Sequence, residues 1–398
     1  MKISLFGYGN TTKSIVKKFP NAIFYDDKCT KPFKDKNNFL VKPSSMFEPN
    51  YSDLEVTSPG IPPNNPLIQK AKNLMSDYDF FAKDFPFSIW ISGTNGKTTT
   101  TQMMQHLLKD KGSLAGGNIG TAVAELDKKA NIWILETSSF TLHYTNIAKP
   151  NIYVLLPISP DHLSWHTDMK GYTDAKLKPL SFMQEGEVAL VPKEFSHVET
   201  KAYKIVYDSY EDLAKKFDID ISKVKFKGAF LTDALLAMSV DKILFDRTNY
   251  NKINSFTIEP HRQEEFFDKK SRLWVNDTKA TNIDATIVAL QNYKDKFIHL
   301  IVGGDDKGVC LKPLFAFLTT LHVKIYAIGS NKNKLINLAK EYNIQHQLCK
   351  NLEESVTLID ENFTTKEVAL LSPASASLDE FRSYAHRGDT FKDKVLSL

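Results

Sequence analysis

The sequence predicts an α/β fold of several domains, each built on a mainly parallel sheet. Short apolar runs recur along the 398 residues, most are followed at once by Gly, Pro or polar residues, and helix-length segments separate them. At roughly 100–200 residues per domain, the length predicts two to four domains. We place boundaries near residues 85 and 260, which gives predicted domains 1–85, 86–259 and 260–398.

Composition excludes several classes of protein. With 42% hydrophobic and 25% charged residues, the chain can bury a core and is not mainly disordered. No apolar run approaches the ~18–20 residues of a membrane helix. The 51 basic and 47 acidic residues give a net charge of +4, and the lysines are scattered. Cys29, Cys310 and Cys349 lack metal-type spacing, which fits a reducing compartment. We therefore expect a cytoplasmic protein, and the short apolar runs and scattered lysines predict no membrane or nucleic-acid partner.

Three strands are predicted in the first domain, at 3–6, 22–25 and 54–56, each followed by a loop. The first loop, 7–12, matches part of a dinucleotide fingerprint, but Thr12 stands where a third Gly or Ala belongs. A tight strand-to-helix turn is an equal alternative. If a ligand binds, Asp26 or Asp27 at the end of the second strand can contact a ribose hydroxyl. That ribose could belong to a nucleotide carrier or to NAD.

A predicted strand at 88–92 leads into Gly93-Thr-Asn-Gly-Lys-Thr98 and then a helix with apolar residues from Met103 to Leu108. Glycines let backbone N–H groups face phosphates, Lys97 can reach the β- and γ-phosphates, and Thr98 can ligate Mg²⁺. The loop is shorter than the standard signature, so a Gly-rich turn opening an ordinary helix is the alternative. The strand and helix context favours ATP binding.

Polar residues follow two further predicted strands, at 132–135 and 152–156. Glu136 follows the first, and Asp161 and His162 come after the second. Oxygen ligands and an imidazole at strand ends near a phosphate loop suit a magnesium–ATP site. Each residue alone would more often be a cap or a core-edge residue, but the group favours the site.

The third domain has predicted strands at 273–275, 297–302, 325–328 and 368–371. Arg262 precedes them and can clamp a phosphate with its planar fork; an ion pair with Glu264 or Glu265 is the alternative. The segments 276–282 and 303–308 follow strands, where the ligand crevice of a parallel sheet is expected. Taken alone, Lys307 in the second segment is a solvated turn.

Together these segments resemble the Mur ligase family. The matching segments span all three predicted domains: GTNGKTT at 93–99, GGNIG at 116–120, LETSSF at 135–140, DHLSWH at 161–166, YTDAKL at 172–177, PHRQE at 260–264, NDTKATN at 276–282, GGDDKG at 303–308 and LLSPASASLDEF at 370–381. The Asp-Asn-Pro-Arg segment of members that add diaminopimelate or lysine is absent. The segment 372–379 stands instead, which favours members that add D-glutamate.

The resemblance implies a Rossmann-like first domain for a UDP-sugar, a central phosphate-loop ATPase domain and a Rossmann-like third domain for an amino acid. It implies small-molecule substrates, UDP-N-acetylmuramoyl-L-alanine and D-glutamate. ATP would convert the terminal carboxylate of the first into an acyl phosphate, which the amino group of the second attacks. We expect a monomer that closes its domains around ATP, because Arg262, Lys279 and Ser377 lie on a different predicted domain from Lys97.

The resemblance also implies residue roles. Lys97, Lys176, His162 and Arg262 would be catalytic. Two Mg²⁺ ions would be held by Thr98, Glu136, His162 and Lys176, the last carbamylated; without the resemblance, Lys176 on a solvated helix face is the alternative. ATP would contact Gly93, Thr94, Asn95, Gly96, Lys97, Thr98, Thr99, Asn118, Arg262 and Asp277. The UDP substrate would contact Asn10, Thr11, Thr12, Asp26, Asp27, Ser58, Pro59, Gly60, Asn118, Ser139 and His162, and D-glutamate would contact Lys279, Thr281, Lys307, Ser377, Leu378 and Tyr384.

Three other functions stay open from the residues. Another ligase of the same superfamily would add a different amino acid, and a nucleotide-dependent switch would use the phosphate loop without ligation. The segment 276–282, Lys307 and Ser377 weigh against the switch, which does not need them. An NAD-binding oxidoreductase built on Gly7 and Gly9 leaves the phosphate loop unexplained.

Overall fold

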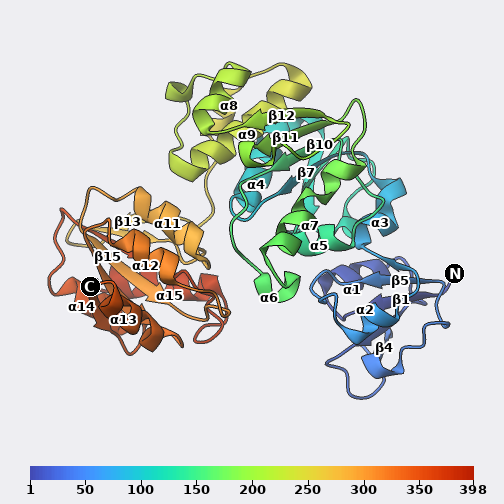
Figure 1. The fold of residues 1–398 in the computed structure, drawn as a ribbon, viewed down its shortest axis with the longest axis horizontal. Coiled ribbons are helices and arrows are strands. Elements are labelled where there is room, and N and C mark those ends of the chain that lie inside the picture. Colours follow the sequence, from blue (N-terminus) through green and yellow to red (C-terminus); the bar gives the residue numbers. More distant parts are fainter. The chain divides into compact units, whose positions relative to one another are not determined.

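The chain forms two compact units in the computed structural model, Met1–Phe256 and Thr257–Leu398 (Figure 1). The structure describes residues 1–398, apart from the side chain of Ser164. The first unit contains two six-stranded sheets and the second contains one. The start of the second unit lies close to the predicted boundary at 260. The predicted boundary near 85 falls between the two sheets of the first unit, and as a domain boundary it stays a prediction.

The amino-terminal sheet has the strand order β3-β4-β2-β1-β5-β6. Its strands are β1 (Ile3–Phe6), β2 (Ile23–Asp26), β3 (Phe33–Lys34), β4 (Leu40–Pro43), β5 (Leu54–Thr57) and β6 (Leu74–Met75), with helices α1 (Asn10–Val16), α2 (Pro66–Lys70) and α3 (Asp77–Phe81). All pairs are parallel except β3 with β4. The loops after β2, β1 and β5 therefore emerge side by side at one edge of the sheet.

The central sheet is entirely parallel, in the order β12-β11-β10-β7-β9-β8. Its strands are β7 (Phe87–Ser92), β8 (Ser113–Gly117), β9 (Ile132–Glu136), β10 (Ile152–Leu155), β11 (Val188–Pro192) and β12 (Tyr203–Tyr207), and the helices are α4 (Lys97–Leu108), α5 (Ser139–Tyr144), α6 (Leu163–His166), α7 (Met169–Phe182), α8 (Tyr210–Phe217), α9 (Gly228–Phe245) and α10 (Tyr250–Asn254). Helix α4 packs against α9, and α5 packs against α7 (Figure 1). Strands covered by helices on both faces are almost continuously apolar, as β7, β9 and β10 are.

The second unit has the order β13-β14-β18-β15-β16-β17, parallel except for the edge pair β13 with β14. Its strands are β13 (Glu264–Phe267), β14 (Leu273–Asn276), β15 (Ile298–Gly303), β16 (Val323–Ile328), β17 (Gln345–Leu348) and β18 (Val368–Leu371), and the helices are α11 (Ile283–Gln291), α12 (Lys312–Leu318), α13 (Lys332–Glu341), α14 (Leu352–Asp360) and α15 (Tyr384–Leu396). Two apolar clusters pack around this sheet.

Each strand predicted from an apolar run is confirmed, from β1 to β18, within two residues at either end. Eight strands were not predicted: β3, β4, β6, β8, β11, β12, β13 and β17. The mainly parallel α/β fold is therefore confirmed. None of the helices in the described part of the chain is both long and apolar enough to cross a membrane.

Candidate active site

The central sheet brings four of the predicted segments together at one edge. The phosphate loop follows β7, Asn118 follows β8, Glu136 is the last residue of β9, and Asp161 and His162 lie after β10. These four strands are consecutive neighbours in a parallel sheet, so their carboxyl ends share one edge.

The phosphate loop depends on its two glycines. Gly93 has φ +138°, and a Cβ there would lie 2.5 Å from Cβ of Leu156. Gly96 has φ +82°, and a Cβ there would lie 2.5 Å from Oδ1 of Asp233 on α9. Helix α4 then starts with no side-chain cap, which leaves amide groups of its first turn facing outward. Such a helix terminus favours an anion.

Two lysines converge on the carbonyl oxygen of Gly93. Lys97 Nζ donates to it at 2.9 Å and to the carbonyl of Thr94 at 2.7 Å. Lys176 Nζ, on α7, donates to it at 2.7 Å and lies 4.7 Å from the ring centre of Tyr172. Lys176 is 1% exposed, so the alternative of a solvated helix face is wrong.

Burial and the neighbouring Lys97 hold the pKa of Lys176 well below its ordinary value, although Asp161 and Glu136 oppose the shift. Desolvation disfavours the ammonium form, and a second cation nearby adds to that effect. These surroundings therefore favour the neutral amine form of Lys176 over the ammonium form.

Glu136 has one satisfied and one unsatisfied oxygen. Its Oε1 accepts a hydrogen bond of 2.7 Å from Nδ2 of Asn118, and its carbonyl accepts from the amide of the same residue. Its Oε2 is buried and has no hydrogen-bond partner among the described residues. A buried carboxylate oxygen without a partner is costly, and a hard cation such as Mg²⁺ would satisfy it.

The donor set near Glu136 suits magnesium rather than zinc. Among the described residues, no three His, Cys, Asp or Glu side chains gather as a metal cluster. The predicted set of Thr98, Glu136, His162 and Lys176 contains only two such side chains. A site with few protein ligands, completed by water and phosphate oxygens, is typical of Mg²⁺.

His162 lies in a left-handed backbone conformation with φ +53°. Its Nε2 is 3.5 Å from Oδ2 of Asp161, and its ring packs edge-on against Phe140 with centroids 4.7 Å apart. Ser139 is 3% exposed, and its hydroxyl lies 2.9 Å from Nε2 of His166. Burial, together with nearby cationic groups, lowers the pKa of His166 to about 4, so this ring is neutral at pH 7.

The other predicted residues of the phosphate loop differ in accessibility. Thr94 is buried, and its Oγ1 interacts with the carbonyl of Ser159 and the hydroxyl of Tyr172, both at 3.0 Å. Asn95 is exposed and Thr98 is half-buried. Thr99 is 1% exposed and points into the protein. The side chains of Thr94 and Thr99 are therefore enclosed by the protein, whereas Asn95 and Thr98 are accessible to a ligand.

The loops predicted for the UDP substrate emerge together from β1, β2 and β5. Asn10, Thr11, Ser58, Pro59 and Gly60 are exposed or half-buried. Thr12 differs, because it is fully buried and donates to the carbonyl of Gly7 at 2.6 Å.

The two predicted aspartates at the end of β2 already have partners. Asp26 accepts from the amide of Tyr8 at 2.7 Å, which holds the first loop, and Asp27 accepts from Nδ2 of Asn65. A contact of Asp26 with ribose would have to share that carboxylate with the Tyr8 amide.

The loop after β5 is attached to the central sheet's helices. Tyr144, the last residue of α5, donates through its hydroxyl to the carbonyl of Ile61 at 2.6 Å. Nε1 of Trp165, on α6, donates to the carbonyl of Gly60 at 3.2 Å. The Ser58–Ile61 loop and the His162 segment are thus joined within the first unit.

In the second unit, Arg262 and Asp277 lie at the same end of the β13–β14 hairpin. Nε and Nη2 of Arg262 are buried without a hydrogen-bond partner among the described residues. Glu264 pairs with Lys392, and Glu265 accepts from Tyr293, so the predicted alternative of an ion pair with either glutamate is wrong. Complete burial raises the pKa of Asp277 to about 7, although Ser372, the amide of Gln263 and Arg262 oppose the shift.

Five of the six residues predicted for D-glutamate lie on loops after β14, β15 and β18, and the sixth, Tyr384, is the first residue of α15. Strands β14, β18 and β15 are consecutive neighbours in this sheet. Lys279 is 4.0 Å from Glu259 and 5.3 Å from the ring centre of Tyr384. Ser377 is 3% exposed, whereas Leu378 is 74% exposed. Thr281 is half-buried, and Lys307 lies on an exposed turn with φ +51°.

Sequence reasoning missed Asp233 and Arg387. Asp233 on α9 accepts from Thr100 and approaches Gly96 of the phosphate loop. Arg387 on α15 is 1% exposed and hydrogen-bonded to the loops of the second unit. Both are charged residues inside helices, and a pattern that assigns charge to the solvent face cannot find them.

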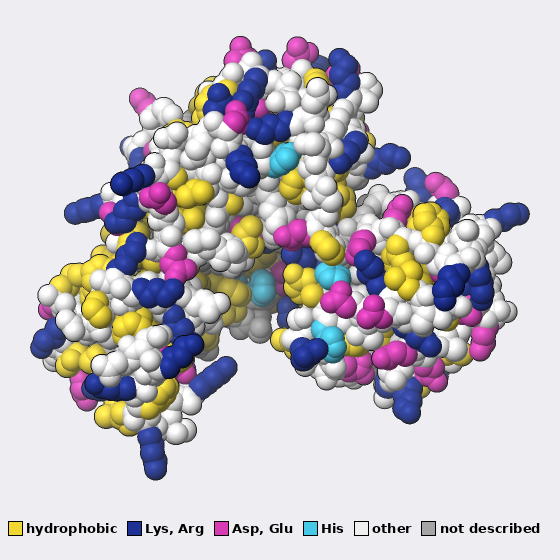
Figure 2. Space-filling view, turned by 180° about the vertical axis from the view of Figure 1, so that it is seen from behind, with side chains coloured by type: hydrophobic (Ala, Val, Ile, Leu, Met, Phe, Trp, Pro, Cys, Tyr) yellow, Lys and Arg dark blue, Asp and Glu magenta, His cyan; other side chains and the backbone are white. Residues whose placement is uncertain are grey.

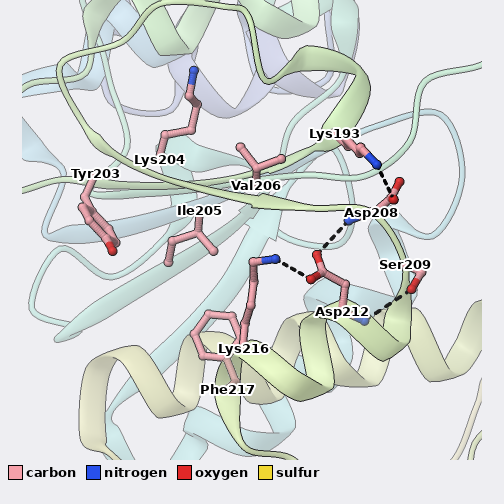
Figure 3. Close-up of a pocket in the computed structure, with 10 residues that line it drawn as sticks. All are labelled: Lys193, Tyr203, Lys204, Ile205, Val206, Asp208, Ser209, Asp212, Lys216 and Phe217. Atoms are coloured by element: carbon pink, nitrogen blue, oxygen red, sulfur yellow. Dashed lines mark hydrogen bonds and ion pairs between the residues drawn. The ribbon is translucent and has the colours of Figure 1, made fainter.

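A cavity of about 810 Å³ lies at the free edge of the central sheet, between β12 and α8 (Figure 3). Four of its charged groups form pairs, Lys193 with Asp208 and Lys216 with Asp212, and Lys204 donates to backbone carbonyls. It contains none of the predicted site residues, and we assign it no ligand. On the face shown in Figure 2, acidic and basic side chains are both widely spread.

A phosphate loop on a parallel sheet, with a buried lysine and an unsatisfied glutamate at the neighbouring strand ends, defines an ATP-dependent enzyme of the α/β class. Comparison with known proteins is more specific. Residues 91–234 match the Mur ligase middle domain. The chain belongs to the Mur ligase family.

Curated relatives match the chain from end to end. A UDP-N-acetylmuramoylalanine--D-glutamate ligase of Campylobacter jejuni is 54% identical over 400 residues, which cover 99% of each chain. A relative of the same name from Helicobacter pylori is 46% identical over 420 residues, covering 100% of each. Among solved structures, a MurF ligase from Thermotoga maritima in complex with ADP aligns with a TM-score of 0.60 at 17% identity, over 94% of each chain, which supports the fold.

Proposed function

We propose that this protein is an ATP-dependent UDP-N-acetylmuramoylalanine--D-glutamate ligase, which joins D-glutamate to UDP-N-acetylmuramoyl-L-alanine in the synthesis of peptidoglycan precursors. The observation that carries the proposal is the end-to-end match to two curated relatives of that name. The arrangement of the phosphate loop, Lys176 and Glu136 agrees with it.

The three sheets would belong to three domains, each of which binds one substrate. The loops after β1, β2 and β5 would bind the UDP end of the first substrate, the carboxyl edge of the central sheet would bind ATP, and the loops after β14, β15 and β18 would bind D-glutamate. Exposure of Asn10 and Gly60, and of Lys307, supports the first and third assignments. We expect a cytoplasmic monomer.

The reaction would proceed in two steps. The terminal carboxylate of UDP-N-acetylmuramoyl-L-alanine attacks the γ-phosphorus of ATP, which gives an acyl phosphate and ADP. The neutral amino group of D-glutamate then attacks the acyl carbon, an amide bond forms, a proton is released and phosphate leaves. Formation of the mixed anhydride provides the leaving group that a free carboxylate lacks.

Lys97 would stabilise the transferring phosphoryl group. Its ammonium now donates to two carbonyls of its own loop, and it lies on the first turn of α4, where it can turn to phosphate oxygens instead. A contribution of Arg262 stays a prediction, and its unpaired Nε and Nη2 support it.

The residues fit magnesium, as the unsatisfied Oε2 of Glu136 indicates. Thr98 and Glu136 would hold one Mg²⁺ and His162 a second, and Asn118 orients Glu136 by fixing its other oxygen. When bound, Mg²⁺ would neutralise phosphate charge and polarise the phosphoryl group.

Lys176 would act as a carbamate. A neutral amine reacts with CO₂ to give a carbamate and a proton, whereas an ammonium has no lone pair for that reaction. The lowered pKa of Lys176 and its burial support this modification, because they favour the neutral amine. The modification would place an anion beside the ammonium group of Lys97.

The test is ATP-dependent phosphate release with UDP-N-acetylmuramoyl-L-alanine, comparing D-glutamate with L-glutamate, L-alanine and a diamino acid, with the product identified by mass. Release with D-glutamate alone and addition of one glutamyl residue are expected. Release with another amino acid would assign a different ligase of the superfamily. ATP binding without amino-acid-dependent release would favour the nucleotide switch.

A further inference from the structure

Arg387 is a buried cation bonded to neutral acceptors. It lies on α15, is 1% exposed, and forms no ion pair among those of the described residues. Burial lowers its pKa to about 10, although Asp379 and Glu380 oppose the shift, so it stays protonated at pH 7. Burying a guanidinium that is held only by carbonyl and hydroxyl oxygens costs free energy of folding. We therefore expect its contacts to have a functional role.

Those contacts join three separate loops. Nε donates to Oγ1 of Thr278 at 2.8 Å and Nη2 donates to the carbonyl of the same residue at 3.0 Å, after β14. Nη1 donates to the carbonyl of Gly303, the last residue of β15, at 3.4 Å. Nη2 and Nη1 also donate to the carbonyls of Ser375 and Ala376, after β18, at 3.1 and 3.4 Å.

The same three loops carry the residues predicted for D-glutamate. Lys279 directly follows Thr278, Ser377 directly follows Ala376, and Lys307 lies on the loop that begins at Gly303. The second and third loops are also paired with each other, because the amides of Asp305 and Ala376 donate to each other's carbonyls at 3.0 and 2.8 Å. Thr278 in turn donates to the carbonyl of Tyr384.

We propose that Arg387 is the positioning residue of the amino-acid site: its planar fork fixes the relative positions of the three loops that present Lys279, Lys307 and Ser377. The inference rests on the proposed function, which assigns those residues to D-glutamate. Arg387 acts through the backbone of the loops and does not itself contact the substrate. A lysine keeps the charge but lacks the fork, so it cannot reach three loops at once.

The test uses the full chain with R387M and R387K. Michaelis constants for D-glutamate and for ATP come from phosphate release, and amide hydrogen exchange is measured at Asp305 and Ala376. Both variants are expected to raise the KM for D-glutamate by on the order of tenfold or more, because small misplacements of binding groups are costly. The KM for ATP is expected to stay unchanged, and the amides of Asp305 and Ala376 should lose protection.

Arg272 provides the matched control. It is also a buried arginine of the second unit, 4% exposed. However, it lies before the amino-terminal end of β14, whereas Thr278 follows the carboxyl-terminal end, and it pairs with Asp268 and Asp360. R272M should lower thermal stability and leave the KM for D-glutamate unchanged. Folded R387M with wild-type KM for D-glutamate and wild-type exchange would overturn the proposal, as would R387K that behaves like the wild type.

A third variant covers a failure of R387M and R387K to fold. T278V removes the hydroxyl that accepts from Nε and donates to the carbonyl of Tyr384. It should raise the KM for D-glutamate and weaken protection at Ala376 to a smaller degree than R387M. If T278V left both unchanged, the proposal would fall. A wild-type protein that releases no phosphate with D-glutamate would refute the proposed function, while hydrogen exchange in the variants would still decide whether Arg387 holds the loops.

Discussion

Asp77 and Asp79 lie in the first turn of α3, and their surroundings predict opposite effects of substitution. Asp77 is buried, and its Oδ1 has no hydrogen-bond partner among the described residues. Asp79 accepts three backbone hydrogen bonds, from Asn146 at 2.7 Å, Ile147 at 2.9 Å and Ala148 at 2.8 Å. The first carboxylate is therefore expected to destabilise the fold when it ionises, and the second to stabilise it.

The magnitude for Asp77 follows from its pKa. Burial, with a smaller contribution from Asp79, raises the pKa of Asp77 from 3.8 to about 7, although backbone amides oppose the shift. The folded state thus holds a proton that the unfolded state releases near pH 4. Stability from this group is fully present below pH 3.8 and is lost as the pH rises to about 7. The full loss is about 4 kcal/mol, at 1.36 kcal/mol per pKa unit.

The assay is urea unfolding of the wild type, D77N and D79N, followed by far-ultraviolet circular dichroism from about pH 5 to 8. D79N leaves one backbone amide without an acceptor and should lower the free energy of unfolding by about 2–3 kcal/mol at every pH in this range. Because Asp79 lies in the first unit, the unfolding transition that D79N shifts is the transition of that unit. Relative to the wild type, D77N should gain about 1 kcal/mol per pH unit and level off above pH 7. A stability difference between D77N and wild type that does not change with pH would refute the reasoning.

Further predictions concern the phosphate loop. K97A should fold normally and lose turnover by roughly 10²-fold or more, measured as phosphate release, because it removes the positive charge that the first turn of α4 would bring to the phosphoryl group; near-normal turnover would contradict the assigned role. K176A should also fold and lose turnover, and partial recovery with added formate or acetate would support a carbamate, whereas substantial activity without such acids would oppose it. G93A should abolish nucleotide binding in calorimetry, because a Cβ would lie 2.5 Å from Cβ of Leu156. Chelation of Mg²⁺ should stop phosphate release reversibly, and activity that persists in excess chelator would exclude the metal role of Glu136.

Much of the fold could be predicted because most core strands of parallel sheets are continuous apolar runs. Strand β8 was missed because it contains two glycines and is defined by pairing with β9. Strand β17 is a mostly polar edge strand that pairs only with β16 among the described strands. In both, hydrogen bonding to a neighbour outweighs local sequence preference.

The candidate site could be predicted where a residue type follows a strand end, as for Glu136 and Lys97. The burial of Lys176 could not, because its helix carries Lys170, Asp174 and Lys178 nearby and reads as a polar surface helix. Only the packing of α7 against the phosphate loop removes it from water. Arg387 was missed for the same reason, since its contacts come from loops more than eighty residues away as well as from nearby ones.

The attachment of Trp165 to Gly60 gives the protein an intrinsic optical probe. The other tryptophans of the chain are almost fully buried: Trp90, Trp133 and Trp274. Trp165 is half-buried, and its indole N–H donates to the loop predicted to bind the UDP end of the substrate. A ligand that settles on this loop changes the polarity around one indole and leaves the other three in place. Steady-state emission of the unlabelled chain therefore reports occupancy of the first substrate site separately from turnover.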